Sequence, residues 1–210
     1  MTILRLWAAL LSVLLGVTAC IRRKQPLFFK ILLFGCASYL VGAVFEACFT
    51  LVYGQPPAGF HVGYLGYAGA YFFLLSAYFG AINRLADGGE PRYRRHRLGA
   101  LAGTLALAGA TVWSVMQSGL SALPSLLLLM PISLTLYFAL KLLILPDVEM
   151  GIIRVMRPYN ACIISLCLCE ALGRSAQIPL WAQTAAQCAV CLLLVLSLPL
   201  AQKGVRKWYI

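Results

Sequence analysis

The chain has 210 residues, of which 62% are hydrophobic and only 11% are charged, and its formal net charge is +11. A soluble protein carries about 25% charged residues, so this composition excludes an ordinary soluble domain and fits a protein surrounded by lipid. The basic residues lack the interleaved aromatic side chains of a nucleic-acid surface, and they are better explained as determinants of membrane topology. We therefore expect the lipid bilayer, and no nucleic acid, as a partner.

Apolar segments long enough to cross a bilayer follow one another along the whole chain. A hydrocarbon core of about 30 Å needs about 20 helical residues. The sequence predicts seven such helices, approximately at residues 3–20, 28–53, 63–85, 98–117, 122–145, 159–178 and 182–201. Little remains for a soluble domain, so we expect an all-α polytopic integral membrane protein in which residues 1–210 form a single seven-helix domain.

The first predicted helix has an alternative interpretation. The stretch Val17-Thr18-Ala19-Cys20 resembles a bacterial lipoprotein signal, and cleavage before Cys20 would leave six helices. Three basic residues follow directly at 22–24, and they favour retention of this flank in the cytoplasm. We expect the helix to be retained, and the mass of the intact protein distinguishes the two outcomes.

The distribution of basic residues predicts the orientation of the bundle. If the N-terminus is outside and the C-terminus is cytoplasmic, 15 of the 17 Lys and Arg residues fall in or beside cytoplasmic segments, as the positive-inside rule requires. Only Arg5 and Arg174 fall on the other side. We expect a multi-pass protein of the cell membrane, most simply the bacterial cytoplasmic (inner) membrane.

The predicted order of helices also allows an internal repeat. Helices 1–3 and 5–7 share one orientation, with helix 4 as a connector, and placing Glu46 on Glu170 superimposes the first two helices of each half. A parallel 3+1+3 repeat of this kind is known for small-solute transporters, with the site between the halves. Any bundle with this number of helices gives a similar overlap, so the repeat rests on topology alone.

Small residues line one side of two predicted helices. Helix 3 has Gly63, Gly66 and Gly69, and helix 4 has a small residue at every turn: Gly99, Gly103, Ala106 and Ala110. In lipid, such residues let neighbouring helices approach closely. We expect both helices to pack tightly on these faces, with a ligand groove as the alternative.

Two of the six acidic residues, Glu46 and Glu170, are predicted to lie inside the membrane. A charge in the hydrocarbon region costs several kcal/mol, so such residues are functional candidates by default. Glu170 and Arg174 are four residues apart and share a helix face, so a purely structural pair is the alternative there. Glu46 has no basic residue within four positions, so it needs a partner from another helix, protonation or a water-filled cavity.

A stripe of tyrosines follows helix 3 at helical spacing: Tyr64, Tyr67, Tyr71 and Tyr78. The deeper pair, Tyr71 and Tyr78, would line a small cavity together with Glu46, and aromatic faces attract cations. Core packing is the alternative for this stripe. The predicted binding site for a small polar or cationic solute consists of Glu46, Tyr71, Tyr78, Glu170 and Arg174.

Several kinds of chemistry are excluded by what the sequence lacks. The two histidines, His61 and His96, are predicted on opposite sides of the membrane, so they cannot converge on a zinc ion. No motif of a serine hydrolase or a phosphate-binding loop is present. The cysteines lie within or beside apolar helices and predict no disulfide framework. We expect no catalytic residue, no metal and no cofactor.

These features favour a small-solute transporter in which helices kinked at Pro131 and Pro199 move around a polar site near Glu46. The first alternative is a receptor-like or accessory protein that acts through a separate membrane partner or as a homo-oligomer. The second is a metal-free enzyme that acts on a lipid with Glu46 and Glu170. Since no catalytic motif is found, we expect the chain not to be an enzyme.

Overall fold

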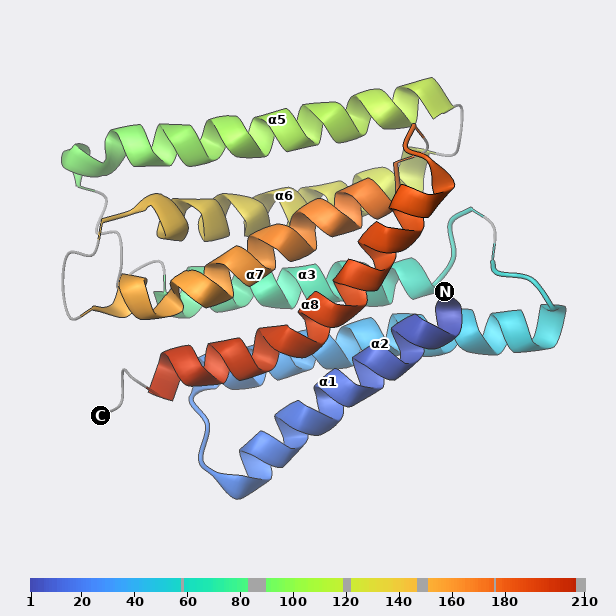
Figure 1. Cartoon of the computed structure of the whole chain (residues 1–210), viewed down its shortest axis with the longest axis horizontal. Helices are drawn as coiled ribbons and strands as arrows, with labels where there is room; N and C mark the ends of the chain where they lie inside the picture. Colours follow the sequence, from blue (N-terminus) through green and yellow to red (C-terminus); the bar gives the residue numbers. More distant parts are fainter. Residues whose placement is uncertain (58, 83–89, 119–121, 147–150, 176, 207–210) are drawn as a thin grey trace.

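The computed structural model describes residues 1–57, 59–82, 90–118, 122–146, 151–175 and 177–206 (Figure 1). Within these ranges the chain is all-helical and has no strand. The elements are α1 (Thr2–Arg22), α2 (Leu27–Tyr53), α3 (Gly63–Ala77), the π-helical turn η1 (Tyr78–Ile82), the 3₁₀ turn η2 (Pro91–Tyr93), α5 (Arg94–Ser118), α6 (Ala122–Ile144), α7 (Ile152–Gly173) and α8 (Leu180–Arg206).

Six of the seven α-helices, all except α3, are long and apolar enough to cross a membrane. The shorter α3 has 15 residues and continues directly into the five residues of η1. Large apolar side chains cover the outer surface, where Leu51, Met116 and Trp181 are each at least three-quarters exposed. Such a surface is stable only in lipid. The prediction of a multi-pass helical membrane protein is confirmed at this level.

Some helix ends differ from the predicted ones. Helix α7 begins at Ile152 instead of near residue 159, because Pro158 is accommodated inside the helix. A proline near a helix start leaves only one carbonyl without its backbone donor, so it need not end the helix. Helix α7 ends at Gly173 rather than 178, and α8 runs on to Arg206 rather than 201. The predicted end of helix 3, at 83–85, lies outside the described residues.

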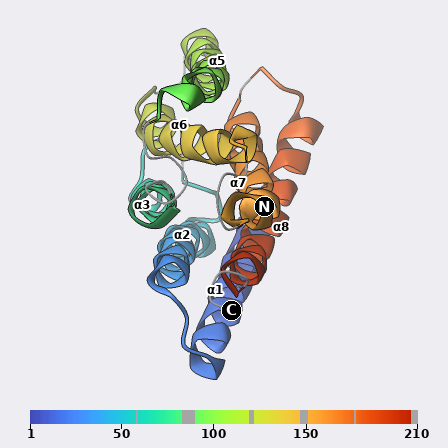
Figure 2. The same cartoon turned by 90° about the vertical axis from the view of Figure 1, so that its left-hand side faces the viewer.

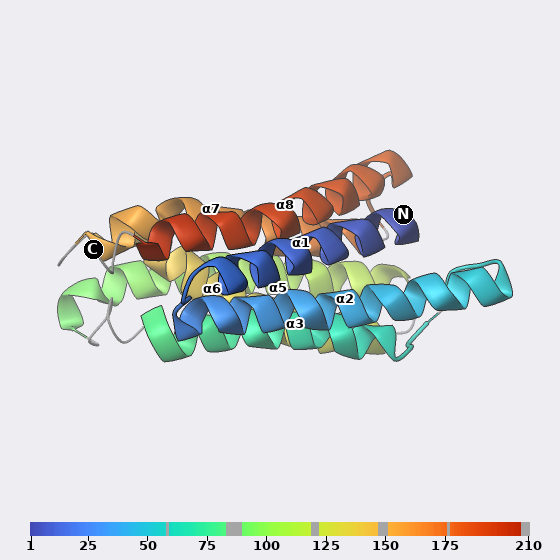
Figure 3. The ribbon, with the colours of Figure 1, turned by 90° about the horizontal axis from the view of Figure 1, so that it is seen from below.

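The helices form two groups of three, and α5 lies outside them. Helix α1 packs on α2 and α2 on α3, while α6 packs on α7 and α7 on α8. The groups meet where α1 lies beside α8 and α3 beside α6, and α5 packs mainly on α6 (Figures 1 and 2). Figure 3 shows α1 between α2 and α8. Whether the two groups are related by a repeat stays a prediction.

The glycine face of α3 packs tightly against α2, as predicted. A Cβ atom added to Gly66 would lie 2.6 Å from the backbone nitrogen of Gly42, and one added to Gly42 would lie 2.7 Å from the carbonyl oxygen of Gly63. The Ser38 hydroxyl donates a hydrogen bond of 2.9 Å to the Gly66 carbonyl across the same crossing. Glycines therefore set the closest approach of the two helices, which also brings the ends of α2 and α3 together.

The corresponding prediction for α5 is wrong. A Cβ atom on Gly99 would meet nothing within 4 Å, and one on Gly103 would meet only the side chain of Leu140, at 3.3 Å. Ala106 and Ala110 are exposed. Because α5 has one main neighbour, α6, a helix face that points away from α6 stays open however small its residues are.

Candidate functional site: a charged cavity at one end of the bundle

A cavity of about 660 Å³ lies at the end of the bundle where α1 begins and α2 and α7 end (Figure 1). Its polar lining comes from segments far apart in the sequence and includes Arg5, Glu46, His61, Tyr64, Arg174 and Gln187. The helices alternate in direction, so the N-terminus shares this end with the α2–α3 and α7–α8 connections, and α8 ends at the other end of the bundle. The cavity therefore depends on several helix ends meeting.

Glu46 forms an ion pair with Arg5 of α1 in the wall of this cavity. The Arg5 Nη1 atom donates to Glu46 Oε2 at 3.4 Å, and the two side chains are 14% and 12% exposed. His61 Nε2 lies 3.7 Å from the other carboxylate oxygen, and its ring stacks on Phe45 with centroids 5.5 Å apart. Glu46 thus has the cross-helix partner that its sequence context required, and that partner is Arg5.

Glu170 and Arg174 form the pair that their spacing predicted. The Arg174 Nε atom donates to Glu170 Oε1 at 2.7 Å, and the Glu170 side chain is only 3% exposed. The guanidinium group also lies over the rings of Tyr64 and Tyr67, 5.2 and 5.7 Å from their centroids. Arg174 lines the cavity whereas Glu170 does not, so the carboxylate binds the arginine from the side away from the cavity.

The charged side chains that line the cavity are two arginines, Arg5 and Arg174, and the carboxylate of Glu46. The second carboxylate, Glu170, pairs with Arg174 from outside the lining. Burial lowers the pKa of His61 below its ordinary value, the charge of Arg174 lowers it further, and Glu46 offsets only part of this effect. His61 is thus neutral near pH 7, and the cationic side chains of the wall are the two arginines.

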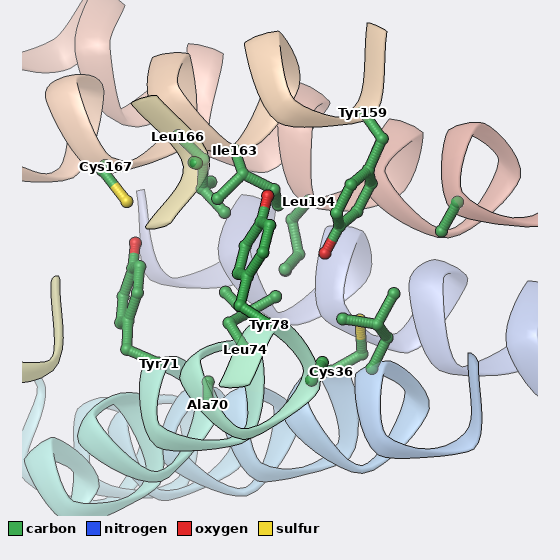
Figure 4. Packing of buried hydrophobic residues seen from close by; sticks show 14 of the residues in the cluster. Cys36, Ala70, Tyr71, Leu74, Tyr78, Tyr159, Ile163, Leu166, Cys167 and Leu194 are labelled. Carbon is green, nitrogen blue, oxygen red and sulfur yellow. The ribbon is translucent and has the colours of Figure 1, made fainter. Parts of the chain in front are cut away.

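Tyr71 and Tyr78 do not line this cavity. Both are buried, at 1% and 0% exposure, among side chains of α2, α7 and α8 (Figure 4). The Tyr78 hydroxyl donates to Asn160 Oδ1 at 2.9 Å, and the Tyr71 hydroxyl has no hydrogen-bond partner in the described part of the chain. Of the five predicted site residues, the structure brings Glu46 and Arg174 to the cavity, with Glu170 behind Arg174.

Two titratable cavity residues, Arg5 and His61, were not predicted as site residues from the sequence. A usable signal for Arg5 was present, since Arg5 and Glu46 stand at nearly equal distances from the connection at 23–26. In an antiparallel helix pair, residues equally far from the turn lie at the same height. His61 carried no such signal, because a connecting segment has no periodicity that fixes where its side chains point.

The described residues offer no set of three or more His, Cys, Asp or Glu side chains that could hold a metal ion. All eight cysteines are free thiols. No family model, curated protein or solved structure matches the chain. The function is therefore argued from the cavity alone.

Proposed function

We propose that the protein is a membrane transporter whose charged cavity binds a small solute carrying an anionic group. The observation that carries this proposal is the pair of arginines, Arg5 and Arg174, that face one cavity from different helices. Guanidinium groups bind carboxylate and phosphate through paired hydrogen bonds. Arg5 lies in the first turn of α1 and Arg174 directly follows α7, and each is held in place by a carboxylate, Glu46 or Glu170.

The charge balance favours an anionic or zwitterionic solute over the cation expected from the tyrosine stripe. Tyr71 and Tyr78 lie in the packed core, and the Tyr64 ring that does line the cavity already has the Arg174 guanidinium over it. A cationic solute would meet two guanidinium groups and the one lining carboxylate of Glu46. An anionic group would meet the same two guanidinium groups, while Glu170, the partner of Arg174, lies outside the lining.

The packing beneath the cavity supports a carrier rather than an open pore. Tyr71, Leu74, Tyr78 and Leu166 are buried between the two groups of helices (Figure 4). A binding site that is open at one end of the bundle and closed by packed side chains at the other is typical of one access state of a transporter.

The proposed orientation places the cavity outside the cell. Basic residues gather at the opposite end of the bundle, in the 22–24 connection, around η2 and at the start of α7 (Figure 1), as expected for a cytoplasmic face. In a variant without native cysteines, Pro57→Cys should react with a membrane-impermeant maleimide on intact cells. Arg95→Cys should react only after permeabilisation, and the reverse result would overturn the orientation.

Transport can be tested with the purified protein in proteoliposomes on a solid-supported membrane. Currents would be recorded after jumps of inorganic phosphate, lactate, glycine betaine and choline. We expect a response to at least one solute with an anionic group and none to choline, and we expect Arg5→Gln to reduce that response at least tenfold. The control is Arg23→Gln, which removes an exposed arginine at the other end. A response to choline alone, or equal responses from both variants, would contradict the proposal.

One observation favours the accessory-protein alternative. The face of α5 with Gly99, Ala106 and Ala110 is open and lined by small residues, which in lipid permit close approach of another helix. A separate membrane partner or a second copy of the chain would fit there. Copurification of a stoichiometric partner, with no transport of any tested solute, would favour this function. The lipid-enzyme alternative gains no such support, because Glu170 does not line the cavity.

A further inference from the structure

An apolar groove on the lipid-facing surface of the bundle adjoins the charged cavity. It has a volume of about 90 Å³, lies between α5, α6 and α7, and is lined largely by apolar side chains that include Leu107, Leu128 and Ile132. Two residues, Arg174 and Ser125, line both the groove and the charged cavity. The groove and the cavity therefore meet at Arg174 and Ser125.

The groove has a buried floor and an open side. Leu128 and Ile132, on α6, are 1% and 3% exposed, whereas Leu172 on α7 is 46% exposed, and Ala110 on α5 is exposed as well. A molecule in the groove would thus touch packed core residues on one side and the surrounding lipid on the other. Access would be sideways from the bilayer and not only from water.

Polar groups at the inner end of the groove are already satisfied. The hydroxyl groups of Ser114 and Ser175 lie 2.8 Å apart and bond to each other, and the Thr111 hydroxyl donates to the Leu107 carbonyl at 2.9 Å. Among the described residues that line the groove, Arg174 is then the one with a charged side chain. This combination suits a ligand that is apolar along its length and anionic at one end.

We propose that the solute bound by this protein is an anionic amphiphile. Its headgroup occupies the charged cavity between Arg5 and Arg174, and its alkyl chain lies in the groove between α5, α6 and α7. The inference rests on the proposed function, because it names the substrate class of the same cavity. A free small anion would use the cavity alone, and the groove that opens from Arg174 into the lipid would then have no part in binding.

The test uses the full-length protein in nanodiscs of phosphatidylcholine, a bilayer without net charge. Binding of decyl phosphate, methyl phosphate and decyltrimethylammonium is measured by microscale thermophoresis. These probes separate the contribution of the chain from that of the headgroup. Ala110→Trp fills the groove, and Ala106→Trp is the matched control, because Ala106 is an exposed alanine one turn earlier on the same helix that does not line the groove.

We expect Ala110→Trp to weaken binding of decyl phosphate at least tenfold and Ala106→Trp to change it less than twofold. Methyl phosphate should bind weakly and equally to both variants, and decyltrimethylammonium should not compete. Arg5→Gln should weaken binding of both phosphates. If Ala110→Trp leaves decyl phosphate binding unchanged while Arg5→Gln abolishes it, the amphiphile proposal fails and the anion-binding function stands. If Arg5→Gln has no effect on either phosphate, the proposed function itself fails.

Discussion

The pair of Arg5 and Glu46 leads to a quantitative prediction about stability. The two side chains are 14% and 12% exposed and their charged atoms lie 3.4 Å apart. Removing one partner of a fully buried ion pair costs about 3–5 kcal/mol, because the other charge is left without compensation. Water in the cavity reduces this penalty, and His61 remains 3.7 Å from Glu46. We therefore expect Arg5→Gln and Glu46→Gln each to lower the free energy of unfolding by about 2 kcal/mol.

The double variant separates the pair from the effects of each single change. Once both charges are gone, no uncompensated ion remains, so the double variant should lose about 1–2 kcal/mol less than the sum of the single losses. Reversible unfolding in mixed micelles of a mild detergent and SDS, followed by tryptophan fluorescence, measures all four proteins. A loss in the double variant that equals the sum of the two single losses to within about 0.5 kcal/mol would refute the reasoning.

A matched control exists at the other end of the bundle. Glu90 and Arg92 also form an ion pair, but their side chains are 50% and 58% exposed. An exposed pair contributes about 0–1 kcal/mol, so neutralising either residue should change the free energy of unfolding by less than about 1 kcal/mol. Equal losses at the two pairs would show that exposure does not govern the penalty.

Three further predictions concern packing, a buried hydrogen bond and pH. Gly66→Ala should lower the free energy of unfolding by about 1–3 kcal/mol, because α2 and α3 must separate to make room for the methyl group. Gly99→Ala, in open space, should raise the free energy of unfolding by up to about 1 kcal/mol. Comparable losses of stability in the two variants would contradict the packing argument. Tyr78→Phe should cost about 1 kcal/mol because its hydroxyl donates a buried bond, and Tyr71→Phe, whose hydroxyl has no partner, should cost almost nothing. The pKa of His61 in the folded protein lies below the ordinary value of 6.5, so the unfolded chain takes up the proton first. The free energy of unfolding should therefore decrease as the pH falls from about 7.5 to 5.5. A pH dependence that His61→Gln does not reduce would count against this.

The helices were predictable because membrane insertion depends on local composition. Each apolar segment carries its own signal, and the basic connections separate the segments without reference to the rest of the fold. The start of α7 was not predictable in this way, because Pro158 is a helix breaker in isolation and is tolerated only in context. The prediction that α5 packs tightly on its small-residue face was wrong for a related reason. The small residues around Gly103 are a property of one helix, and they do not indicate how many neighbours that helix has.

The residues of the candidate site also differ in whether local sequence was enough to predict them. The pair of Glu170 and Arg174 follows from spacing within one helix, so the sequence was sufficient. The pair of Arg5 and Glu46 requires that α1 and α2 pack side by side with equal residue counts from their turn, and His61 requires the path of a connecting segment. Tyr71 and Tyr78 lie in the packed core, which the sequence left open as the alternative to a cavity lining, because a periodicity of 3.6 identifies a shared face but not what that face contacts.

The position of the buried hydrogen bonds bears on how a transporter of this build would work. Tyr78 belongs to the group of α1, α2 and α3, and Asn160 belongs to the group of α6, α7 and α8, so their bond of 2.9 Å ties the two groups together. Tyr78 lies about 20 Å along the helix from Tyr64, which lines the charged cavity. A second bond between the groups runs from the Thr135 hydroxyl to the Tyr71 carbonyl at 3.3 Å. Under the proposed function, opening the other side requires these bonds to break and Arg174 to leave the rings of Tyr64 and Tyr67 on α3. The arginines keep their carboxylates in this step, because each of the two ion pairs lies within one group of helices.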